Sequence, residues 1–98
     1  MKAVEYGDVY DTLHDHFHRC GIGDNGDEDY EILVRLCAAA VLSGTTADAL
    51  GKDARYQTWS SIRDLLDGCN MEEVGVMEVV RNAVQYAAKE LGVTLDAD

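Results

Sequence analysis

The residues of this chain that are best suited to chemistry lie in one stretch, LHDHFHRCGIGDNGDED, at positions 13–29. The stretch contains all three histidines and one of the three cysteines. His14 and His18 are four residues apart and would share one face of a helix, with Asp11 one turn earlier. Such a group could hold a divalent ion, but the spacing supplies no fourth ligand and no zinc-hydrolase glutamate. Histidines that interact with the C-terminal end of a helix are therefore favoured over a metal site.

The turn GIGDNGDEDYE within this stretch can be compared with a calcium-binding loop. An EF-hand loop needs aspartate at its first position, oxygen ligands at its third and fifth, and glycine at its sixth. With Gly26 as the sixth residue, the first is Gly21; with Gly23 as the sixth, the first is His18. Because neither frame provides the aspartate, the sequence predicts a solvated turn that leads into a helix N-terminus.

Motifs for catalysis are missing from the rest of the sequence. There is no phosphate-binding loop, dinucleotide fingerprint or nucleophile elbow. Residues 45–66 have the outline of a helix-turn-helix, but the second helix would offer only Arg55 and Arg63 to DNA. We therefore expect a non-enzymatic protein without a cofactor, a metal or direct contact with nucleic acid.

Net charge is the most unusual property of the sequence. It has 19 acidic residues against 8 basic ones, a formal charge of −11. A chain with this charge is repelled by nucleic acid and by anionic membranes, and is attracted to basic proteins. The densest acidic cluster lies just after the turn, and we predict that it binds such a partner. Its members are Asp24, Asp27, Glu28, Asp29 and Glu31.

The cysteines indicate the compartment. Cys20, Cys37 and Cys69 are odd in number, widely spaced and free of C-x-x-C pairs, so they predict neither a disulfide framework nor a zinc site. No secretory signal is visible, and no apolar run reaches the roughly 18 residues that a membrane-spanning helix needs. A cytoplasmic location is expected.

The elements that must position these residues are all helices. The chain of 98 residues suits one domain, residues 1–98, and it contains no proline. Apolar residues recur at spacings of three and four, which predicts an all-α chain forming a single small irregular bundle. We expect four main helices, at about 4–20, 29–43, from 53 or 58 to 67, and 71–91, plus one short helix at 47–50. Residues 32–42, with one charge, should be the most buried.

Local signals define the helix ends. Gly21, Gly44 and Gly92 follow apolar segments and predict C-terminal stops. Residues 70–73 match a capping box, with Asn70 as the cap of the last helix. The β-branched run at 74–80 could form a strand, but its neighbours continue a helical period, so helix is favoured.

Two functions are compatible with these properties. Size, acidity and the lack of an active site are similar to those of small acidic proteins that phages and mobile elements use against host defence, including anti-CRISPR proteins. This likeness of type implies an inhibitor, or a DNA-mimic-like binder, of a basic nucleic-acid-binding protein. The alternative is a helical adaptor that forms a homodimer through an apolar repeat on its last helix. The repeat comprises Met77, Val80, Val84, Ala87 and Leu91.

Overall fold

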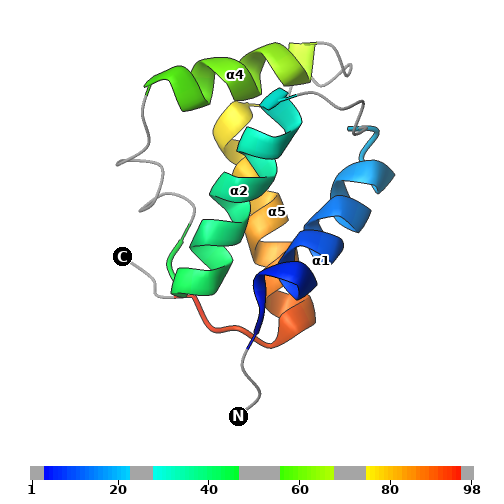
Figure 1. The fold of residues 1–98 in the computed structure, drawn as a ribbon, viewed down its shortest axis with the longest axis vertical. Coiled ribbons are helices and arrows are strands. Elements are labelled where there is room, and N and C mark those ends of the chain that lie inside the picture. Colours follow the sequence, from blue (N-terminus) through cyan, green and yellow to red (C-terminus); the bar gives the residue numbers. More distant parts are fainter. Residues whose placement is uncertain (1–3, 23–27, 47–55, 68–74, 96–98) are drawn as a thin grey trace.

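The computed structural model describes residues 4–22, 28–46, 56–67 and 75–95. Within these ranges the chain forms four helices and no β-strand, which confirms the predicted all-α bundle (Figure 1). The helices are α1 (Tyr6–Arg19), α2 (Glu28–Ser43), α4 (Tyr56–Asp67) and α5 (Val76–Leu91). The short helix predicted at 47–50 lies outside the described residues. None of the helices found in the described ranges is long and apolar enough to cross a membrane.

The helices pack as a three-helix bundle of α1, α2 and α5, with α4 across one end. α1 packs against both α2 and α5, and it runs antiparallel to them (Figure 1). α4 crosses the end of the bundle where α2 and α5 begin, and it contacts both of them (Figure 1). This arrangement leaves one long side of α1 open to solvent, beside α5.

α2 supplies more buried residues than any other described helix, as its apolar sequence predicts. Leu33 and Cys37, one turn apart, are fully buried among residues of the other helices. Burial is not uniform over the predicted segment 32–42, however, because Leu36 is only partly buried and Leu42 is 43% exposed. A helix with neighbours on only some of its sides still has a solvent side, and Arg35 lies on it.

The apolar repeat of the last helix faces the inside of the chain. Val80, Val84 and Ala87 are buried in the core together with residues of α1 and α2. Met77 and Leu91, at the two ends of the repeat, are partly buried against the same core. A second copy could reach the centre of this surface only if the bundle opened, so the structure offers no exposed seam along α5.

The predicted start of the last helix is wrong. α5 begins at Val76, after Gly75 in an extended N-cap conformation, and not near residue 71. Glycine is well accepted at an N-cap but weakens a helix interior, which accounts for the later start. The predicted capping box lies outside the described residues. Of the two predicted caps of α4, Thr58 lies inside the helix and is not its cap, and Asp53 lies outside the described residues.

The C-terminal stops at Gly44 and Gly92 are confirmed. Both glycines adopt positive φ, at 67° and 71°. After Gly92 the Val93 amide donates to the Ala88 carbonyl at 2.8 Å, so a Schellman-type turn closes α5. The left-handed conformation strains any residue with a Cβ, which is why glycine ends the helix here.

Two glycine substitutions are expected to change stability in opposite directions. Gly92→Ala should lower the free energy of unfolding by about 1 kcal/mol, because alanine would be held at positive φ. Gly7→Ala should raise it by about 0.5–1 kcal/mol, because Gly7 is helical and has open space around its Cβ position. Urea denaturation measures both free energies of unfolding. Shifts of the same sign would contradict either the left-handed backbone at Gly92 or the helical backbone at Gly7.

Candidate functional site

The acidic cluster predicted from the sequence is only partly described. Asp24 and Asp27 lie outside the described residues, whereas Glu28, Asp29 and Glu31 form the first turn of α2. Acidic side chains there complement the positive end of the helix dipole. Glu31 also accepts a hydrogen bond from the Tyr10 hydroxyl at 3.2 Å, which ties α2 to α1. One member of the cluster thus has a structural role between helices.

His14 and His18 are part of an aromatic column and not of a ligand group. The rings of Tyr6, Tyr10, His14 and His18 follow each other along α1, with centroids 6.1–6.3 Å apart. His14 Nδ1 lies 2.7 Å from the hydroxyl oxygen of buried Tyr30, so this histidine is bound to α2. Within the described ranges, no three His, Cys, Asp or Glu side chains are grouped as metal ligands.

The solvent side of α1 carries an acidic stripe that the sequence reading missed. Glu5, Asp8, Asp11 and Asp15 are all exposed, at spacings of three, three and four residues. At 100° per residue they occupy an arc of about 120°, on the side opposite to the buried residues of α1. The spacing of these residues is visible in the sequence, but the prediction was made for the denser acidic cluster at residues 24–31. We call these four residues the α1 acidic stripe.

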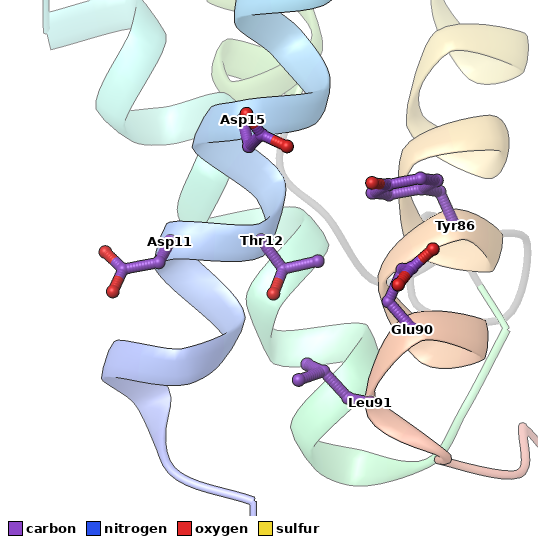
Figure 2. A pocket seen from close by; sticks show the side chains of 6 residues that line it. All are labelled: Asp11, Thr12, Asp15, Tyr86, Glu90 and Leu91. Carbon is purple, nitrogen blue, oxygen red and sulfur yellow. The ribbon is translucent and has the colours of Figure 1, made fainter.

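The stripe borders a shallow groove of about 310 Å³ between α1 and α5. Figure 2 shows Thr12 and Asp15 on α1 directed toward α5, Tyr86 on α5 directed toward α1, and Glu90 on α5 below Tyr86. Asp11 lines the rim and points outward (Figure 2). Leu91 completes the lining at the C-terminal end of α5.

One end of the groove already holds a guanidinium group from the chain itself. Arg19 forms a 2.5 Å ion pair with Asp15 and donates a hydrogen bond to the Tyr86 hydroxyl. Its Cζ lies 5.3 Å from the centre of the Tyr86 ring. The hydrogen bond to Tyr86, followed by the interactions with Asp15, raises the pKa of Arg19. A carboxylate beside an aromatic ring therefore recognises a cation at this position.

His16 also packs on Tyr86. The two rings stack with centroids 4.8 Å apart and an angle of 27° between their planes. Partial burial lowers the pKa of His16, the positive charge of Arg19 lowers it further, and Asp15 opposes both effects. The stack fixes the position of Tyr86 at the groove.

Most carboxylates in and beside the groove have no ion pair with a cation in the described residues. Asp8, Asp11 and Glu90 form no ion pair with a cation in the described parts of the chain, and all three are exposed. Between Asp8 and Asp15 the stripe carries a carboxylate about every 5 Å, given a rise of about 1.5 Å per residue. A DNA strand carries a phosphate about every 3.4 Å. The charge density is of the same order.

The described cysteines differ in accessibility. Cys37 is fully buried, and this burial raises the pKa of its thiol, so it is an inert part of the core. Cys20, the last residue of the predicted first helix, is exposed; α1 ends at Arg19, and Cys20 is its C-cap. Cys69 lies outside the described residues.

Fold and site together define a small all-α bundle with an acidic groove suited to cations. Comparisons with protein-family models, curated proteins and solved structures give no match.

Proposed function

We propose that this chain is a non-enzymatic interaction protein that binds a basic protein partner through its acidic surface. The partner class that fits best is a nucleic-acid-binding protein, whose exposed lysines and arginines normally meet phosphates. By occupying those side chains, the chain would act as an inhibitor, in the manner of the anti-defence proteins of phages. Binding of this kind requires neither a cofactor nor a metal.

The observation that carries the proposal is the unpaired acidic surface beside the groove. Asp8 and Asp11 on α1 and Glu90 on α5 are exposed carboxylates without an ion pair to a described cation. A partner could pair with such groups without first breaking an ion pair to a described cation. The interaction of Arg19 with Asp15 and Tyr86 is an internal example of the contact that an arginine of the partner would make.

The predicted cluster at the start of α2 remains a second candidate contact surface. It comprises Asp24 and Asp27, which lie outside the described residues, and Glu28, Asp29 and Glu31 in the first turn of α2. We place the main contact on α1, because Glu31 is already bound by Tyr10 and lies 3.9 Å from the Arg35 side chain.

The proposal is tested by capture of partners at low salt from an extract of the native host. We expect the wild-type chain to retain one or a few basic nucleic-acid-binding proteins, identified by mass spectrometry. Asp8→Asn with Asp11→Asn should lose them. The matched control is Asp64→Asn with Glu78→Gln, which removes the same charge from exposed positions outside the groove. Glu78 lies in the first turn of α5, as Asp8 does in α1, so dipole effects are matched as well.

Retention of the same proteins by both variants would show that the α1 acidic stripe is not the contact. Retention of only neutral or acidic proteins by the wild-type chain would contradict the proposed partner class itself.

A further inference from the structure

His16 and Cys20 form a pair of potential metal ligands at the C-terminal end of α1. They are four residues apart, and Nε2 of His16 lies 3.8 Å from Sγ of Cys20. Cys20 is exposed, and the His16 ring is held in place by its stack on Tyr86. This pair is distinct from the His14 and His18 face considered from the sequence.

The separation of the two atoms fits zinc. Zinc binds a cysteine sulfur at about 2.3 Å and a histidine nitrogen at about 2.0–2.1 Å, almost always in a tetrahedron. Two such ligands at a tetrahedral angle are about 3.6 Å apart. A shift of a few tenths of an ångström would therefore let His16 and Cys20 chelate one ion, with α1 unchanged.

The pair lies at the C-terminal end of α1. This position favours metal binding over nucleophilic chemistry at Cys20. Carbonyl groups at a helix C-terminus carry partial negative charge, which favours a bound cation. Reactive thiolates are instead found at helix N-termini or beside cations. Arg19 is the nearby cation, but its guanidinium is paired with Asp15 and hydrogen-bonded to Tyr86.

The described residues of one chain supply only half of a tetrahedral site. The described residues contain no group of three or more His, Cys, Asp or Glu side chains placed to hold a metal. Two other described candidates are engaged elsewhere: His14 is bound to Tyr30, and Cys37 is buried in the core. A second copy related by a twofold axis would add the same pair and complete a closed Cys₂His₂ set.

We propose that His16 and Cys20 bind a thiophilic divalent cation such as Zn²⁺, shared with the same pair of a second copy. One metal ion then joins two chains, and the thiol proton of each Cys20 is released to solvent on binding. The proposal is independent of the acidic-surface function, because it uses neither the stripe carboxylates nor a protein partner.

Titration with Co²⁺, which takes the same tetrahedral ligands and is coloured, tests the site. The reduced full-length chain should develop a thiolate-to-cobalt band and tetrahedral ligand-field bands that saturate at one metal per two chains. With Zn²⁺, light scattering should show a doubled mass that returns to the monomer on chelation. Cys20→Ser and His16→Gln should each abolish both signals, while circular dichroism confirms that the variants are folded.

His18→Gln and Cys69→Ser serve as controls, and both should keep the wild-type spectrum and the doubled mass. The proposal is overturned if no thiolate-to-cobalt band appears, or if Cys20→Ser leaves it unchanged. Saturation at one metal per monomer, without a change in mass, would equally overturn the shared site.

Discussion

Leu33→Ala is expected to lower the free energy of unfolding by about 2–5 kcal/mol, the usual cost of a large-to-small change in a core. Leu33 of α2 is fully buried and belongs to the core cluster to which α1, α4 and α5 also contribute. Domains of this size are stable by about 5–15 kcal/mol, so the change removes a large part of the total. Urea denaturation followed by circular dichroism provides the measurement.

Leu36→Ala is the matched control for this prediction. It removes the same atoms from the same helix, but Leu36 is only partly buried. Its loss should be clearly smaller than that of Leu33→Ala. Equal losses, or a larger loss for Leu36→Ala, would mean that Leu36 faces the core at least as fully as Leu33 does, which would contradict the orientation of α2 about its own axis.

The arrangement of the core was predictable because it follows from local periodicity. Val9, Leu13 and Phe17 recur every four residues, and all three are buried. Gly44 and Gly92 stop helices because left-handed backbone is open to glycine. Such signals act within a few residues of the chain, so a single sequence reveals them.

The candidate site was harder to predict because it depends on contacts between distant residues. Arg19 and Tyr86 are 67 positions apart, and nothing local to either residue indicates the partner. The groove likewise exists only because α5 packs beside α1. The exposure of Cys20 depends on the helix ending one residue earlier, and helix ends are less well defined than helix interiors.

The second large effect is expected on the affinity for a basic partner. Asp8→Asn with Asp11→Asn should weaken the complex by roughly tenfold at low ionic strength, given about 1 kcal/mol for a pair of close charges in water. Most of the loss should be in the association rate, because charges at the rim of an interface mainly steer the encounter. Asp64→Asn with Glu78→Gln has the same net charge and should change the affinity much less.

A third double variant compares the two acidic surfaces. Asp24→Asn with Glu28→Gln removes two charges from the cluster before and in the first turn of α2, and leaves Glu31 to accept its hydrogen bond from Tyr10. If α1 is the main contact, this variant should lose less affinity than Asp8→Asn with Asp11→Asn. The reverse order would move the contact to the start of α2.

Association kinetics as a function of salt test the central claim most directly. The rate constant for the captured partner should be measured by stopped flow for the wild-type chain, the Asp8→Asn, Asp11→Asn variant and the matched control. Because the Debye length falls from about 30 Å at 0.01 M to about 3 Å at 1 M, salt screens long-range attraction. We predict that the wild-type rate falls steeply with salt, that the control follows it, and that the stripe variant starts slower and converges at high salt. Identical rates for the wild-type chain and the stripe variant at every salt concentration would contradict the account.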